Sequence, residues 1–281
     1  MHRRDFIARS ALGPVLAAAI QAAAGADGEP LPRIALGDLE VSRLILGSNP
    51  FFGFSHQTAE RDQEMRDYFT PGRMVETLEA AAEAGITAIA APVYDHWIDL
   101  FTRYREDGGR LRHWLAQPDP APDAMEDTIR RAVDAGAEAV FIQGHVVDNQ
   151  FAAGEAETVR RWVGLIKDLG VPAGMASHLH TTHLEAEEAG FPTDFYFQCL
   201  YNPAEGYLAE QRERALDAIG CIEKPVIAYK ILAAGRNDPA EGFATALGRI
   251  REKDGICVGI FPKEQPNQIA ENAELTRLSS D

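Results

Sequence analysis

The 281-residue chain has little cysteine and a deficit of positive charge. Cys199, Cys221 and Cys257 are odd in number and show no CxxC spacing, so neither a disulfide framework nor a cysteine metal site is indicated. Cys199 and Cys257 lie inside apolar runs, which predicts buried thiols. Lys and Arg number 27 against 43 Asp and Glu, giving a formal net charge of −16. This balance argues against nucleic acid and anionic membranes as partners.

Motifs of several common enzyme classes are also missing. No GxGxxG follows a predicted strand and no P-loop occurs, so neither a Rossmann site nor an ATP site is indicated. The chain has no GxSxG elbow of a serine hydrolase and no HExxH zinc motif. Beyond the N-terminal stretch, no segment is apolar enough to cross a bilayer.

The N-terminus resembles a twin-arginine export signal. Residues His2–Ile7 (HRRDFI) hold an arginine pair followed by apolar residues, and a mild apolar stretch runs over Ser10–Ala24. Small residues follow, and the apolar run is too short for a membrane span. We expect residues 1–26 to be a Tat signal peptide recognised by the Tat export machinery, and residues 27–281 to form one periplasmic or secreted domain. The alternative is an Ala-rich cytoplasmic N-terminus.

Short apolar runs alternate with helix-like stretches through the rest of the chain. A hairpin is predicted over Arg33–Ser42, and Phe51–Phe69 is predicted to be a long functional loop. Four helices are expected to stop at glycine, namely Gly85, Gly136, Gly170 and Gly190. The predicted strands are Arg43–Gly47, Ile86–Ala91, Arg112–Ala116, Ala139–Gln143, Pro172–Ala176, Phe195–Cys199, Pro225–Tyr229 and Ile256–Phe261. This order and a length near about 250 residues predict a (β/α)8 TIM barrel with an N-terminal β-hairpin.

Polar and ionisable residues stand where the predicted strands end, which is where such barrels hold their chemistry. We expect Tyr94 and His145 to be an acid/base pair, with His178 and Lys230 assisting by charge or proton transfer. A lysine in a partly dry pocket acts as a base, as a Schiff-base nucleophile or as a protonated donor to substrate. Pairing of Lys230 with a carboxylate is the structural alternative.

Amides and imidazoles dominate the remaining strand-end inventory, which suits a polyhydroxylated ligand held by hydrogen bonds. Phe51, Phe52, Phe54 and Trp97 would supply apolar faces for a sugar ring or would merely plug the barrel mouth. The expected substrate-binding residues are Asn49, His56, Gln117, Gln198 and Asn202. A divalent metal is not favoured, and its weak candidates are His145, His178 and His180.

Several stretches, in the right order, resemble the aldo/keto reductase superfamily. RIALGDLEVSRLILG, which begins at Arg33, resembles the family's opening hairpin and first strand. AGITAI followed by VY is similar to its second strand, FQ with YNP to its sixth strand and loop, and VIAY to its seventh. QPNQIAEN, which ends at Asn272, resembles the last cofactor-facing helix. The similarity covers nearly all of the chain after the predicted signal.

The resemblance implies a barrel enzyme and matches only part of the family's catalytic set. Tyr94 matches the tyrosine acid and His145 the substrate-orienting histidine, but Ala90 and Gln117 replace the aspartate and the lysine. A tyrosine with a pKa of about 10 needs a nearby cation for hydride chemistry at neutral pH, and Gln117 carries no charge. By the same resemblance, NADP would be held by Lys263, Gln268 and Asn272.

These observations favour an exported barrel enzyme that acts on a small hydroxylated or carbonyl compound, such as a sugar derivative. Its chemistry is expected to be lyase- or isomerase-type proton transfer at Tyr, His and Lys, without hydride transfer. One alternative is an NADPH-dependent reductase in which Lys230 supplies the missing cation. The other is a non-catalytic barrel that binds a carbohydrate or a partner protein. No cofactor is favoured; NADP and a divalent metal stay open.

Overall fold

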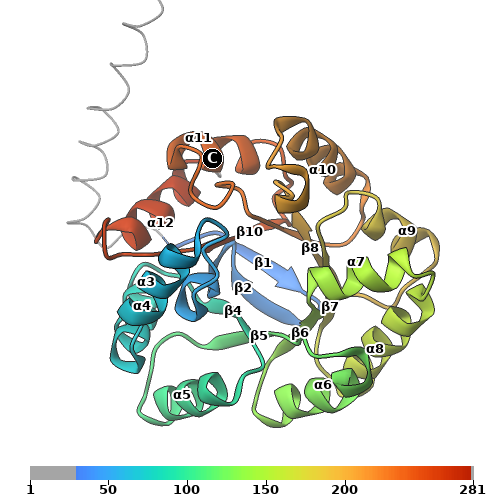
Figure 1. Cartoon of the computed structure of the whole chain (residues 1–281), viewed down its shortest axis with the longest axis horizontal. Helices are drawn as coiled ribbons and strands as arrows, with labels where there is room; N and C mark the ends of the chain where they lie inside the picture. Colours follow the sequence, from blue (N-terminus) through green and yellow to red (C-terminus); the bar gives the residue numbers. More distant parts are fainter. Residues whose placement is uncertain (1–29, 280–281) are drawn as a thin grey trace, which may run out of the picture.

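A computed structural model describes residues 30–279 of the chain, so the predicted signal peptide lies outside the described residues. Figure 1 shows a ring of helices around a central sheet. The sheet is a closed parallel barrel in the order β10-β3-β4-β5-β6-β7-β8-β9. The predicted (β/α)8 TIM barrel is therefore confirmed.

Each barrel strand pairs with the next strand in sequence, and the last strand closes the ring against the first. All eight predicted strands are present, with ends that differ from the prediction by two residues or fewer. The strands are β3 (Leu44–Gly47), β4 (Ala88–Pro92), β5 (His113–Gln117), β6 (Ala139–Ile142), β7 (Ala173–Ser177), β8 (Phe195–Cys199), β9 (Val226–Tyr229) and β10 (Gly255–Gly259).

The predicted hairpin closes the N-terminal end of the barrel. Its strands β1 (Arg33–Leu36) and β2 (Leu39–Ser42) pair antiparallel around Gly37, whose φ of 64° suits a residue without a Cβ. Leu36 and Val41 are fully buried among side chains of the barrel interior. Figure 1 shows the hairpin lying across the centre of the ring. The cavity end of the barrel is therefore the opposite one.

The helices follow the strands and cover the outside of the barrel (Figure 1). The four predicted glycine stops are confirmed, since Gly85, Gly136, Gly170 and Gly190 all have positive φ. The α-helices are α3 (Ala59–Tyr68), α4 (Pro71–Glu83), α5 (Asp95–Glu106), α6 (Met125–Asp134), α7 (Gly144–Ala152), α8 (Ala156–Asp168), α9 (Thr182–Glu188), α10 (Ala209–Cys221), α11 (Pro239–Leu247) and α12 (Gln268–Leu278). Short 3-10 turns are η1 (Asn49–Phe52), η2 (Pro122–Ala124) and η3 (Pro203–Glu205).

The segment Phe51–Phe69, predicted to be a loop, contains α3. The hydroxyl of Thr58 caps this helix by accepting a hydrogen bond from the backbone N–H of Arg61 at 3.1 Å. The side chain of Arg61 then bonds both carboxylate oxygens of Glu264, at 2.7 and 2.9 Å. The helix is mostly polar, so its stabilising contacts are caps and ion pairs, which an apolar periodicity does not reveal.

Side chains along each strand alternate between the barrel interior and the layer beneath the helices. The interior layer contains Leu115, Phe141, Ala176, Phe197 and Ile227. The rings of Phe141 and Phe197 stack with centroids 4.0 Å apart and planes within 4°. Positions two residues further along each strand therefore face the open end, above this apolar floor.

No helix within residues 30–279 is both long enough and apolar enough to span a membrane. The three cysteines are free thiols. Cys199 is buried, as predicted, whereas Cys257 is only partly buried because it faces the open end of the barrel.

Candidate functional site

A cavity of about 690 Å³ opens at the C-terminal ends of the strands. Its floor includes Phe141, Phe197 and Cys257, and its wall includes Phe52 and Phe54. The size is that of a pocket for a small organic molecule. Phe51 and Trp97, two of the four aromatics expected to face a ligand, are instead 2% and 0% exposed and belong to the outer core.

Seven of the residues predicted to be catalytic or to bind substrate line this one cavity. They are Asn49, His56, Tyr94, Gln117, His145, His178 and Lys230. Strand alternation accounts for Gln117 and His178, because each stands two residues after an interior side chain of its strand. The structure thus brings together side chains from six of the barrel's strand ends and from the loop before α3.

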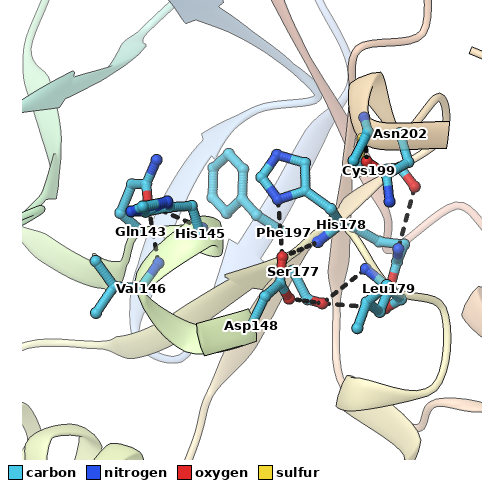
Figure 2. A network of polar contacts seen from close by, with 12 residues as sticks. Gln143, His145, Val146, Asp148, Ser177, His178, Leu179, Phe197, Cys199 and Asn202 are labelled. Atoms are coloured by element: carbon cyan, nitrogen blue, oxygen red, sulfur yellow. Dashed lines mark hydrogen bonds and ion pairs between the residues drawn. The ribbon is translucent and has the colours of Figure 1, made fainter. Parts of the chain in front are cut away.

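Asp148, on α7, fixes the orientation of His178 (Figure 2). Its Oδ2 accepts hydrogen bonds from the His178 backbone N–H at 3.1 Å and lies 2.9 Å from His178 Nδ1. Its Oδ1 accepts from the hydroxyl of Ser177 at 2.6 Å. A carboxylate can only accept, so Nδ1 carries the imidazole hydrogen. Within residues 30–279, Nε2 of His178 has no hydrogen-bond partner, so its lone pair is available in the cavity.

Gly144 lets α7 approach this histidine closely. A Cβ at residue 144 would lie 3.0 Å from Oη of Tyr229 and 3.2 Å from Cε1 of His178. The hydroxyl of Tyr229 donates to the carbonyl of Ser177 at 3.2 Å, which ties β9 to β7. Gly144 is therefore required by packing at the cavity wall rather than by backbone conformation.

Lys230 and His56 form a second pair at the mouth. Nζ of Lys230 lies 3.0 Å from Nε2 of His56, and Nδ2 of Asn49 lies 3.3 Å from the same atom. Burial lowers the pKa of Lys230. Burial, followed by the charge of Lys230, also lowers the pKa of His56. At neutral pH, the imidazole is therefore neutral, and its Nε2 can accept a hydrogen bond from the amine.

The backbone around this pair is strained. Strict alternation would direct Lys230 away from the interior, because the preceding Tyr229 faces inward; instead a φ of 56° redirects its side chain into the cavity. Among residues 30–279, five non-glycine residues have positive φ: His56, Tyr207, Lys230, Ala233 and Ala234. Each such residue costs about 1–3 kcal/mol, and such strain concentrates at functional sites.

These strained segments contact one another. The hydroxyl of Tyr207 and the guanidinium of Arg236 donate to the carbonyl of His56 at 3.4 and 3.1 Å. The amide of Gln57 donates to the carbonyl of Ala234 at 2.8 Å. The loop before α3 is thus hydrogen-bonded to the segments after β8 and β9, which holds His56 against Lys230.

Tyr94 lies on another side of the cavity and bonds a carboxylate. Its hydroxyl donates to Oδ2 of Asp119 at 3.0 Å. Burial, together with the charge of Asp119, raises the pKa of Tyr94. Partial burial also raises the pKa of Asp119. The phenol of Tyr94 therefore stays protonated and acts as a hydrogen-bond donor.

Other predicted site residues lie outside the cavity. Gln198 is fully buried and faces the outer layer, because Phe197 takes the interior position. Asn202 accepts a hydrogen bond from the backbone N–H of Ala204 at 3.0 Å and so caps η3. His180 does not line the cavity, and residues 30–279 hold no group of three or more His, Cys, Asp or Glu arranged for a metal ion.

The residues expected to hold NADP do not converge. Nζ of Lys263 pairs with Glu64 at 2.6 Å, and Asn272 is 3% exposed within α12. Gln268 lines the cavity, but its Oε1 accepts from the backbone N–H of Phe261 at 2.8 Å. Glu264 adds a carboxylate to this side of the mouth. These residues do not fit a nucleotide phosphate.

Lining residues that the sequence pattern did not indicate include Asp119, Gln143 and Tyr229. The signal for Gln143 and Tyr229 was strand alternation, since each stands two residues after an interior side chain. Gln143 also caps α7, because its Oε1 accepts from the backbone N–H groups of His145 and Val146 (Figure 2). Asp119 lies beyond the end of β5, where no periodicity marked it.

No protein-family model and no curated protein matches the chain. Among solved structures, a protein provisionally assigned to the aldo-keto reductases, from Pseudomonas aeruginosa, has a TM-score of 0.63 at 16% identity. The match covers 90% of this chain and 98% of that one. A second structure of that description, also from Pseudomonas aeruginosa, has a TM-score of 0.61 at 17% identity, covering 86% and 94%. A structure named Native KDPGal has a TM-score of 0.50 at 15% identity, covering 84% and 94%. The chain therefore shares the barrel fold of these proteins.

Proposed function

We propose that this protein is an enzyme that moves a proton on a small hydroxylated or carbonyl compound, as in an isomerisation or an elimination, without transferring hydride. One observation carries the proposal: His178 is held at Nδ1 by Asp148, while its Nε2 is open to the cavity. A histidine oriented in this way is a general base. The cavity of about 690 Å³ accommodates a sugar derivative.

The other lining groups complete an acid–base site. Tyr94 stays protonated, so it does not act as a base; in this account its hydroxyl turns from Asp119 to donate to a substrate oxygen. The side chains of Asn49 and Gln117 offer amide donors and acceptors to hydroxyl groups. In this account His145, exposed at the start of α7, exchanges protons with solvent.

Hydride transfer is disfavoured by the neighbour of Tyr94. A reductase of the kind that the sequence resembles needs a cation to stabilise the tyrosine phenolate. Asp119 has the opposite effect, since its charge raises the pKa of Tyr94. Titration with NADPH, followed by quenching of tryptophan fluorescence, is expected to give no saturable binding at millimolar concentration. Tight saturable binding would instead establish the reductase alternative.

Proton exchange tests the proposed function directly. The protein would be incubated in D2O with dihydroxyacetone and with glycolaldehyde, and loss of the carbon-bound proton signal followed by NMR. His178→Gln is expected to slow exchange roughly 100- to 10,000-fold, the usual contribution of a general base. His180→Asn is the matched control, because His180 lies two residues away and outside the cavity. Wild-type exchange no faster than in buffer would reject these substrates, and exchange that survives His178→Gln would reject the role of His178.

We also propose that the protein is exported by the Tat pathway, on the strength of the Arg3-Arg4 pair. Replacing both arginines by lysine is expected to retain the protein in the cytoplasm. Immunoblots of periplasmic and cytoplasmic fractions measure the distribution. Equal export of the wild type and the double variant would contradict the proposal.

A further inference from the structure

Lys230 differs from every other lysine in residues 30–279. Each of the others is held by a carboxylate or a carbonyl oxygen: Lys167, Lys224, Lys253 and Lys263. The amine of Lys230 has no carboxylate partner among the described residues. Its contacts are Nε2 of His56 at 3.0 Å and the ring face of Tyr229, 5.4 Å from its centroid.

The position of this amine suits a reaction with a ligand rather than a structural ion pair. It stands at the end of β9 in the cavity, above a floor that includes Phe197 and Cys257. The positive φ of Lys230 breaks strand alternation and directs the side chain to this place. Burial lowers the pKa of the amine, which increases the neutral, nucleophilic fraction.

We propose that Lys230 forms a covalent imine with the carbonyl carbon of the substrate, which assigns the substrate class to small hydroxylated aldehydes and ketones. The inference deepens the proposed function and rests on it. An imine nitrogen withdraws electrons from the neighbouring carbon, so the proton that His178 removes becomes more acidic. Lys230 thereby supplies the electron sink and His178 the base.

The step balances without a further reactant. The lone pair of Nζ forms the C–N bond while the carbonyl π electrons move to oxygen. That oxygen gains one proton from the nitrogen and a second from solvent, while His56, 3.0 Å from Nζ, orients the amine by accepting a hydrogen bond. The C–O bond then breaks and water leaves, while the nitrogen keeps one proton as an iminium ion. Addition of water reverses the sequence and releases the product.

Reductive trapping tests the imine. The protein would be incubated with dihydroxyacetone or glycolaldehyde and sodium cyanoborohydride, and the adduct counted by intact mass and located by peptide mapping. We expect one adduct per chain, on Lys230, and loss of that adduct to background in Lys230→Arg. Lys167→Arg is the matched control and is expected to label fully, because its amine pairs with Asp194 at 2.7 Å outside the cavity.

Peptide mapping of the wild type keeps the test decisive even if Lys230→Arg fails to fold. Absence of an adduct, or an adduct spread over other lysines, overturns the inference. Proton exchange in D2O, measured in parallel, separates the two proposals. Exchange without trapping at Lys230 overturns the imine and leaves the proposed function, whereas trapping without exchange supports the imine and removes proton transfer as the function.

Discussion

Asp148 and His178 come from α7 and from the end of β7, and Oδ2 of the first lies 2.9 Å from Nδ1 of the second. A carboxylate in this position selects the histidine tautomer whose lone pair is on Nε2. Two elements adjacent in the barrel thus together present the Nε2 lone pair to the cavity.

Asp148→Asn tests this orientation. The amide of asparagine can donate to Nδ1, which would place the hydrogen on Nε2 and remove the base. We expect the maximal exchange rate to fall at least about 100-fold, with little change in KM. Asp95→Asn is the control, because Asp95 pairs with Arg131 on the outside of the barrel. A change confined to KM would contradict a role in orienting the base.

Tyr94→Phe removes the phenol and keeps the ring. The exchange rate is expected to fall roughly 100-fold or more, as for other positioned proton donors. Loss of the hydrogen bond to Asp119 should change the free energy of unfolding by only about 1 kcal/mol. Rates and thermal unfolding would be compared with Tyr68→Phe, whose ring packs on Phe69 and Phe261 away from the catalytic groups. Unchanged turnover would eliminate Tyr94 as an acid, and ligand binding without turnover in either protein would favour the non-catalytic alternative.

Gly144→Ala tests the close approach of α7. The added Cβ would meet Oη of Tyr229 at 3.0 Å and Cε1 of His178 at 3.2 Å, so the histidine must shift. We expect a loss of exchange rate of about tenfold, because the neighbours must shift by a few tenths of an ångström and a misplacement of about 1 Å costs about 100-fold. Gly164→Ala on α8 is the control, with nothing within 4 Å of its added Cβ, and it should stabilise the helix by about 0.5–1 kcal/mol. Equal rates in the two variants would contradict the packing argument.

The pH dependence of stability should depend on His183. Burial lowers the pKa of this fully buried imidazole to about 4, whereas an unfolded histidine titrates near about 6.5. The folded state therefore binds fewer protons between these values. Stability is complete above about pH 6.5 and falls as the pH drops towards 4, by about 3 kcal/mol in total from this group.

His183→Gln should flatten this dependence, since glutamine does not titrate and can still donate to the carbonyl of Phe197. Urea unfolding at pH 7 and pH 5 measures the difference, and His180→Asn should keep the wild-type slope. If the wild type and His183→Gln lost equal stability between these pH values, His183 would not be the titrating group.

Local signals in the sequence were sufficient for the framework of the fold. The strand at Phe195–Cys199 was predicted with its observed bounds, because an apolar run between turn residues needs no tertiary information. Helix ends at glycine, such as Gly85, were also predictable from the sequence, because a residue with left-handed backbone conformation after a helix is usually glycine. The gathering of Tyr94 and His178 at one cavity then followed from barrel geometry alone.

The rest depended on features without a local signal. Gln198 stands at a strand end like His178, but the interior position on β8 belongs to Phe197. Strand alternation would also place the side chain of Lys230 on the outer side of the barrel, and only its positive φ brings it into the cavity. Ion pairing between Arg61 and Glu264 joins residues far apart in the chain, so α3 could not be inferred from its own polar sequence.

The hairpin formed by β1 and β2 has a kinetic implication. Because its side chains pack into the N-terminal end of the barrel interior, we expect reactant and product to use the opening at the C-terminal end. We expect a second substrate molecule to enter only after the product has left. Reactions of a single organic substrate, in which no second substrate has to enter while a product is bound, suit a pocket of this kind.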